Sequence, residues 1–192
     1  LPPASILTLD YKSKKSVIEH YWSLEEHCKK SICKPFLGDE IAAMNELEIL
    51  LMNSIKDQMV ADVPVGAFLS GGIDSSLVTT IMQQNSSKSV KTFSIGFEDD
   101  NYNEAKYANE ISKFLQTDHN EFYLQPKDAL NIIPKLPEIY DEPFADSSQI
   151  PTAIVSNYAR KYAGVILSGD GGDELFGGYT RYLEAKKQID KK

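Results

Sequence analysis

The sequence predicts an α/β fold in which helices cover both faces of a parallel sheet. Short β-type runs alternate with helical patterns between residues 65 and 167. Two glycine-rich loops, residues 70–76 and 168–179, each follow an apolar run. The composition fits one packed domain with an appended segment, because 42% of the 192 residues are hydrophobic and 25% are charged.

The first 36 residues differ in character from the rest. Residues 6–10 and 17–22 predict two short strands around a polar turn, and residues 28–35 indicate a linker. Apolar residues then recur at three- and four-residue intervals from Gly38 to Val60, which predicts a helix. We therefore expect a hairpin and linker over residues 1–36 and the main domain over residues 37–192.

Strands and helices alternate beyond Val60. The expected strands are residues 65–69, 91–97, 118–124 and 164–167. The expected helices are residues 73–84, 103–115, 126–140 with an interruption at two prolines, and 148–162. Ligands on parallel sheets gather beyond the carboxyl ends of the strands, so the loops that begin at Ser70 and Ser168 should lie at one edge.

The first loop, SGGIDSS, joins a strand to a helix in the manner of a phosphate site. Gly71 and Gly72 would let backbone N–H groups approach an anion, which the helix N-terminus also attracts. Three serines would add hydroxyl donors: Ser70, Ser75 and Ser76. The chain holds no Walker A motif, so the loop is not that of a Walker-type NTPase.

Asp74 is an acid placed where phosphate is expected. A carboxylate repels phosphate unless a cation lies between them, so Asp74 predicts Mg²⁺ shared with phosphate oxygens. The alternative is an ordinary acid in the first turn of a helix.

The second loop, SGDGGDELFGGY, holds three carboxylates among five glycines. Acids converge only around a cation or an amine. We interpret Asp173 as a second Mg²⁺ contact, and Asp170 and Glu174 as groups that meet an ammonium or a reacting nitrogen. The alternative is a Ca²⁺-binding or merely flexible acidic turn, although an EF-hand needs Glu where Tyr179 stands.

Charge and composition exclude several classes of function. A net charge of −8 and a pI near 4.9 disfavour a nucleic-acid surface. No apolar stretch approaches the ~20 residues that span a bilayer, and the start at Leu1 shows no secretory signal. Cys28 and Cys33 are too few for a disulfide framework. We expect a cytoplasmic chain without membrane or nucleic-acid partners.

Four ordered blocks, residues 70–76, 92–97, 141–148 and 167–179, resemble those of glutamine-hydrolysing asparagine synthetases, members of the ATP pyrophosphatase (PP-loop) superfamily. The resemblance covers most of residues 60–182. It implies an adenine nucleotide alpha hydrolase-like fold and a ligase that uses ATP and Mg²⁺. In such enzymes the side-chain carboxylate of aspartate attacks the α-phosphorus of ATP, pyrophosphate leaves, and ammonia displaces AMP to give asparagine.

The resemblance also implies roles for single residues. The strand-end backbones near Phe68 and Ile95 would receive adenine, and Leu69 between the strand and the loop would also belong to the cofactor-binding residues. Residues 70–76 would hold pyrophosphate, and Ser168 and Gly169 would line the nucleotide. Asp74 and Asp173 would bind Mg²⁺. Asp170 would orient or deprotonate the attacking ammonia, at a position where some relatives carry glutamate. The block 141–148 is either a helix-capping loop or a substrate loop.

Two family features have no counterpart in the chain. The glutaminase half uses a cysteine directly after the initiator Met, whereas Cys28 and Cys33 are internal. The family's catalytic lysine lies beyond the last block. The lysines within residues 186–192 follow that block too closely to be its counterpart. Residues 1–22 resemble the last strands of the glutaminase half. We therefore expect a fragment that receives ammonia from a glutaminase domain outside this chain. The full-length enzyme could form a homodimer.

Two other functions remain open. The same adenylation chemistry could act on another carboxylate, as in amidation of a sugar acid or closure of a β-lactam. A nucleotide-binding or tRNA-modifying PP-loop module is the third reading, which the acidic balance disfavours.

Overall fold

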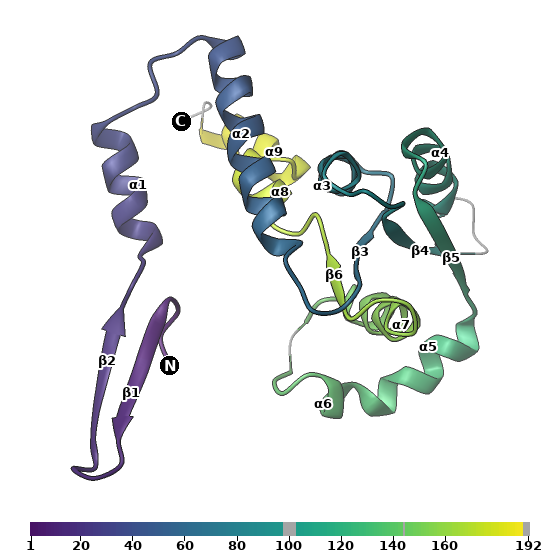
Figure 1. The fold of residues 1–192 in the computed structure, drawn as a ribbon, viewed down its shortest axis with the longest axis horizontal. Helices are drawn as coiled ribbons and strands as arrows, with labels where there is room; N and C mark the ends of the chain where they lie inside the picture. Colours follow the sequence, from purple (N-terminus) through teal and green to yellow (C-terminus); the bar gives the residue numbers. More distant parts are fainter. Residues whose placement is uncertain (98–102, 144, 190–192) are drawn as a thin grey trace. The chain divides into compact units, whose positions relative to one another are not determined.

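The computed structural model describes residues 1–97, 103–143 and 145–189 (Figure 1). It forms two compact units, residues 1–49 and 50–192, and the division falls inside helix α2 (Glu40–Gln58). No helix in the described part of the chain is both long and apolar enough to cross a membrane.

The first unit contains a hairpin and a helix. Strand β1 (Ser5–Asp10) pairs antiparallel with β2 (Lys15–His20). Helix α1 (Leu24–Cys33) follows, so the prediction of a linker over residues 28–35 is wrong. The helix forms because the Ser23 hydroxyl accepts from the Glu26 N–H and two acids occupy the first turn, where they favour the positive end of the helix dipole.

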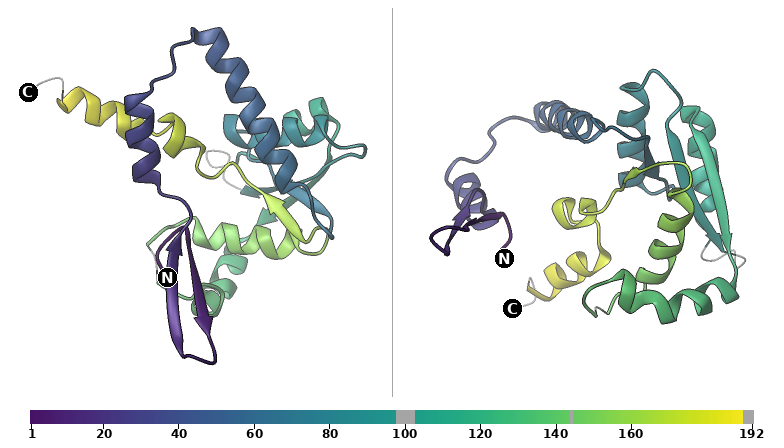
Figure 2. Two further views of the ribbon diagram at one scale, coloured as in Figure 1. Left: turned by 60° about the vertical axis from the view of Figure 1, so that its left-hand side comes forward. Right: turned by 60° about the horizontal axis from the view of Figure 1, so that its bottom comes forward.

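The second unit is built on a four-stranded parallel sheet in the order β5-β4-β3-β6 (Figure 2). The strands are β3 (Val65–Phe68), β4 (Lys91–Phe97), β5 (Asp118–Leu124) and β6 (Val165–Leu167). All four were expected, each within one residue of its observed bounds. The predicted α/β class with a parallel sheet is confirmed.

Helices lie on both faces of this sheet. Helix α3 (Ile73–Gln84) and α4 (Ala105–Leu115) pack on one face, and α7 (Gln149–Ala159) packs on the other beside α5 (Pro126–Ile132). A 3₁₀ turn (Ile133–Lys135) and α6 (Leu136–Ile139) follow α5, as the two prolines predicted. Residues 168–179 were expected to be one loop, but they contain α8 (Gly172–Phe176), and α9 (Thr180–Ile189) follows.

Alternation along the strands divides the core into two clusters. Ala67 and Leu167 pack against Ile81 and Met82 of α3, whereas fully buried Phe93 packs against α7. Successive strand residues point to opposite faces, so β3 and β6 contribute to both clusters. The carboxyl edge of this packed sheet carries the two glycine-rich loops.

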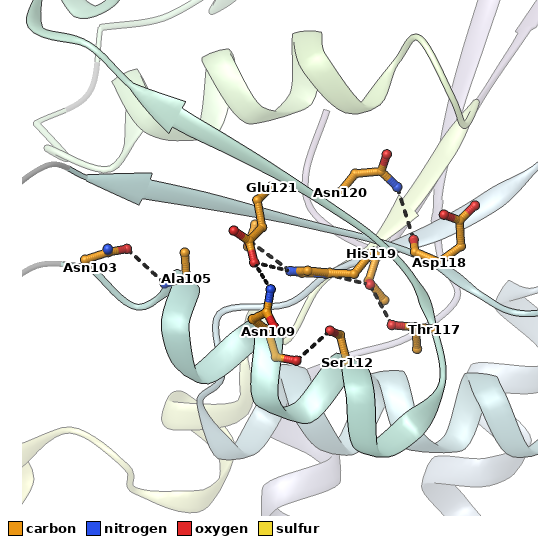
Figure 3. A network of polar contacts seen from close by, with 11 residues as sticks. Asn103, Ala105, Asn109, Ser112, Thr117, Asp118, His119, Asn120 and Glu121 are labelled. Atoms are coloured by element: carbon orange, nitrogen blue, oxygen red, sulfur yellow. Dashed lines mark hydrogen bonds and ion pairs between the residues drawn. The ribbon is translucent and has the colours of Figure 1, made fainter.

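A polar network lies between β4, β5 and α4 (Figure 3). The two ring nitrogens of His119 meet the hydroxyls of Thr92, at 2.8 Å, and Ser94, at 3.2 Å. Glu121 lies 3.6 Å from His119 Nε2 and accepts from the Asn109 amide. Burial, the largest effect, lowers the pKa of His119, and the Glu121 carboxylate partly opposes it. The network joins both strands to the helix by hydrogen bonds.

Candidate active site

The two glycine-rich loops meet because β3 and β6 are neighbours in the sheet. From β3 the chain adds β4 and β5 on one side and then returns to place β6 on the other. This reversal is a topological switch point, where ligands bind in open α/β sheets. A Cβ built on Gly169 would lie 2.8 Å from the Ser75 backbone nitrogen and 3.0 Å from Asp74 Cβ. The predicted convergence of the loops at one edge is therefore present.

The first loop is held open by its glycines. Gly71 has a φ of 87°, and a side chain there would run into Tyr107 and Ala108 of α4. The first backbone bond of α3 joins the Ser76 N–H to the Gly72 carbonyl at 3.1 Å. The N–H groups of residues 73–75 therefore have no acceptor within the helix and can face an anion.

The serine hydroxyls bind the loop itself in this structure. Ser75 is buried, and its Oγ accepts from the Ser70 N–H at 3.2 Å and lies 3.0 Å from Ser70 Oγ. Ser76 Oγ donates to the Gly72 carbonyl at 2.6 Å. Ser75 and Ser76 thus hold the backbone of the loop by hydrogen bonds, while Ser70 is exposed.

We call the space over the first loop the loop cavity; its volume is about 700 Å³. It is lined by Phe68, Ser70, Gly72, Ile73, Asp74, Ser75, Thr152, Val155, Ile166, Ser168, Gly169, Asp170, Asp173, Phe176 and Gly178. Asp74 and Asp173 therefore share one cavity. Among the described residues no group of three or more His, Cys, Asp or Glu side chains could hold a metal. Two carboxylates completed by phosphate oxygens are nevertheless the usual donor set of Mg²⁺, so the residues present fit that ion.

An apolar cavity of about 740 Å³ adjoins the carboxyl ends of β3 and β4. Its lining includes the two positions predicted to receive adenine, Phe68 and Ile95, and the predicted cofactor-binding residue Leu69. Phe93, Phe97 and Val155 also line it. Walls of this kind suit a flat aromatic base. Phe93 and Val155 were not predicted as site residues, because the strand alternation around Phe93 and the helical spacing around Val155 mark them only as core.

A third cavity, of about 490 Å³, is lined by residues of the second loop and of helix α7, and we call it the acidic cavity. Its lining comprises Tyr140, Asp146, Ser148, Gln149, Thr152, Gly169, Asp170, Gly171, Asp173, Glu174 and Tyr179. None of these is basic. The Tyr179 hydroxyl donates to Glu174 at 2.8 Å and lowers the pKa of that carboxyl, and the Ser148 backbone N–H does the same for Asp146.

Asp170 lines all three cavities, and so does Thr152. The Asp170 carboxylate is exposed and accepts from Ser168 Oγ at 3.0 Å. A group at this junction can reach both a nucleotide and a second substrate. Thr152 was missed because nothing in the sequence separates it from the rest of its helix.

The remaining predicted residues are more scattered. Gly71 and Ser76 line none of the three cavities. In the block 141–148, Asp146 caps the backbone N–H of Ser148 at 2.8 Å and also lines the acidic cavity, so both readings of this block keep support. Phe144 of that block and the lysines at 191 and 192 lie outside the described residues.

The chain was compared with known proteins. The family model for asparagine synthase matches residues 46–192. A provisionally named glutamine-hydrolyzing asparagine synthetase 2 of Methanocaldococcus jannaschii is 44% identical over 85% of this chain and 30% of its own length. Glutamine-hydrolyzing asparagine synthetase 1 of Bacillus subtilis is 39% identical over 81% of this chain and 24% of its own length.

Among solved structures, the NH3-dependent NAD synthetase of Campylobacter jejuni aligns with a TM-score of 0.49 and 17% identity, over 70% of this chain and 60% of that chain. The chain spans less than a third of the length of the two curated relatives above. The family match nevertheless covers far more than half of its residues. The chain therefore belongs to the asparagine synthase family.

Proposed function

We propose that this chain is the nucleotide-binding part of an ATP-dependent ligase that adenylates the side-chain carboxylate of aspartate for amide formation with ammonia. The observation that carries the proposal is the meeting of the two loops, with Gly169 and Gly172 packed against Asp74 and Ser75. If the first loop binds phosphate, this contact brings the acids of the second loop near it, where Mg²⁺ and the nitrogen-bearing group could be held beside the nucleotide.

In this proposal each cavity receives one part of the substrates. The adenine ring enters the apolar cavity between Phe68, Ile95 and Val155. The pyrophosphate faces the free N–H groups at the start of α3, where the helix dipole favours negative charge. Asp74 and Asp173 would hold Mg²⁺, which when bound neutralises phosphate charge.

The chemistry proceeds in two steps. An oxygen of the aspartate side chain bonds to the α-phosphorus as the bond to the bridging oxygen of pyrophosphate breaks. Ammonia then attacks the acyl carbon, the bond to AMP breaks, and the nitrogen loses a proton. Asp170 is placed to accept that proton, because it lies where the apolar and acidic cavities meet.

The partners follow from the family. The relatives named glutamine-hydrolyzing are more than three times as long as the matched region, which supports a glutaminase domain outside this chain as the ammonia source. We propose a cytoplasmic setting for this reaction, with ATP and aspartate as substrates.

The decisive experiment measures pyrophosphate release by the full-length protein with ATP, Mg²⁺ and aspartate. We expect release that depends on aspartate, and formation of asparagine and AMP when ammonium or glutamine is added. Glutamate and a sugar acid serve as matched controls. Release with another carboxylate, and none with aspartate, would refute the assignment of the acceptor while leaving adenylation in place.

A further inference from the structure

The Glu174 side chain is held by a hydrogen bond that comes from outside its own helix. The short helix α8 ends at Phe176 and is capped by Gly177, and the chain turns back so that the Gly178 N–H donates to the Asp173 carbonyl at 3.0 Å. This turn brings Tyr179 beside Glu174, and its hydroxyl donates to Glu174 Oε1 at 2.8 Å. An exposed glutamate on a five-residue helix would otherwise sample several rotamers.

The Tyr179 ring is itself fixed by its neighbours. The Arg181 guanidinium stacks over it, 4.1 Å from the ring centroid, and the Tyr182 ring lies 5.7 Å away centroid to centroid. Guanidinium groups are attracted to the faces of aromatic rings. The guanidinium therefore covers one face of the ring, and this contact restricts the direction in which the hydroxyl points.

Both partners of the hydrogen bond line the acidic cavity, together with Asp146, Asp170 and Asp173. The hydroxyl engages Oε1 of Glu174, and a carboxylate has lone pairs enough to accept a further hydrogen bond from a nitrogen donor. Besides the Tyr179 hydroxyl, Arg181 lies close enough to lower the pKa of Glu174, but its guanidinium covers the Tyr179 ring and does not line the cavity. Since no described lining residue is basic, a cationic or amine group is the complementary ligand for the other acids around Glu174.

We propose that Tyr179 is a positioning residue that holds Glu174 toward the nitrogen-bearing substrate in the acidic cavity, with Arg181 supporting the ring. This inference rests on the proposed function. The ligand is an amine or ammonium group, which either free ammonia or the α-amino group of aspartate could supply. Tyr179 acts only through Glu174 and contributes nothing to adenine or pyrophosphate binding.

The test uses three variants of the full-length protein: Tyr179→Phe, Glu174→Gln and the double variant. Tyr179→Phe removes the hydroxyl and keeps the ring that Arg181 covers. We expect kcat/KM for the nitrogen-bearing substrate to fall about tenfold to a hundredfold, as for loss of one hydrogen bond to a charged group. In Glu174→Gln this kcat/KM should fall at least as far as in Tyr179→Phe. The double variant should have the same kcat/KM as Glu174→Gln alone.

The site of the effect identifies the source of the nitrogen. A raised KM for ammonium with an unchanged KM for aspartate assigns Glu174 to ammonia, and the reverse assigns it to the α-amino group of aspartate. Tyr182→Phe is the matched control, because it removes the hydroxyl from the neighbouring ring and should leave both constants unchanged.

Three outcomes would overturn the inference. Wild-type kinetics in Tyr179→Phe, additive losses in the double variant, or a raised KM for ATP would show that the hydroxyl only joins α8 to the following turn. Failure of the proposed function looks different, because wild-type protein would then release no pyrophosphate with aspartate.

Discussion

Gly172 lies against the carboxylate of Asp74, and a Cβ built on Gly172 would come within 2.5 Å of Asp74 Oδ2. The two residues stand almost a hundred positions apart in the sequence, one in each glycine-rich loop. Their approach leaves no room for a side chain at position 172. The carboxylate that we assign to Mg²⁺ is therefore placed by the backbone of the opposite loop.

Gly172→Ala should displace the Asp74 carboxylate and impair adenylation. A displacement of about 1 Å at a reacting centre costs about a hundredfold in rate, so we expect a loss of that order in aspartate-dependent pyrophosphate release. Gly177→Ala is the matched control, because Gly177 lines none of the three cavities. A Cβ there meets nothing within 4 Å, but its φ of 71° strains an alanine, so that variant should lose about 1–2 kcal/mol of stability and keep the rate of aspartate-dependent pyrophosphate release at saturating substrate. Equal rates in the two variants would contradict the steric argument.

Asp74→Asn should weaken the dependence of ATP binding on Mg²⁺. The wild-type protein should bind ATP more tightly with Mg²⁺ than with a chelator, because the ion offsets repulsion between the carboxylate and phosphate. In the variant, isothermal titration calorimetry should show a smaller difference in ATP affinity between the two conditions, because only Asp173 and the phosphate oxygens then hold the ion. Asp118→Asn, at the opposite end of the sheet, should behave as wild type. An undiminished Mg²⁺ effect in Asp74→Asn would remove this residue from the metal site.

Asp170→Asn should separate the two steps of the reaction. If Asp170 accepts the proton of the attacking nitrogen, single-turnover pyrophosphate release should survive while asparagine formation falls about a hundredfold or more. Ser168→Ala, which removes the hydroxyl that donates to Asp170, should cause a smaller loss in the same step. Parallel losses in both steps would instead place Asp170 in nucleotide or aspartate binding.

His119 should make the fold less stable in mild acid. Burial lowers the pKa of His119 in the folded chain, so the unfolded chain takes up a proton first as the pH falls below about 6.5. The stability that the neutral ring contributes is present above that pH and is lost as the pH falls through the folded pKa. Urea unfolding at pH 7.5 and pH 5.5 should show this loss in the wild type and much less of it in His119→Gln. Exposed His27, replaced by Gln, provides the control, and a pH dependence that persists in His119→Gln would contradict the assignment.

Most of the second unit could be predicted from local sequence. Strand β4 and helix α3 were predicted with the bounds observed, because apolar alternation and helical spacing are properties of neighbouring residues. Helix α1 was not predicted, since its exposed and highly charged surface gives no apolar stripe, and Ser23 with two acids is a weak signal by itself. Helix α8 was hidden by the glycines on either side of it.

The sequence by itself determined which elements form, which loops can face an anion, and which acids are available. Only the tertiary structure decided that β6 pairs with β3, that Gly172 meets Asp74, and that Tyr179 holds Glu174. The reason is physical: a local pattern fixes the conformation of a segment, whereas the pairing of distant segments depends on how all buried faces are satisfied together. The residues of the candidate site come from both loops, so their arrangement became visible only when the sheet had assembled.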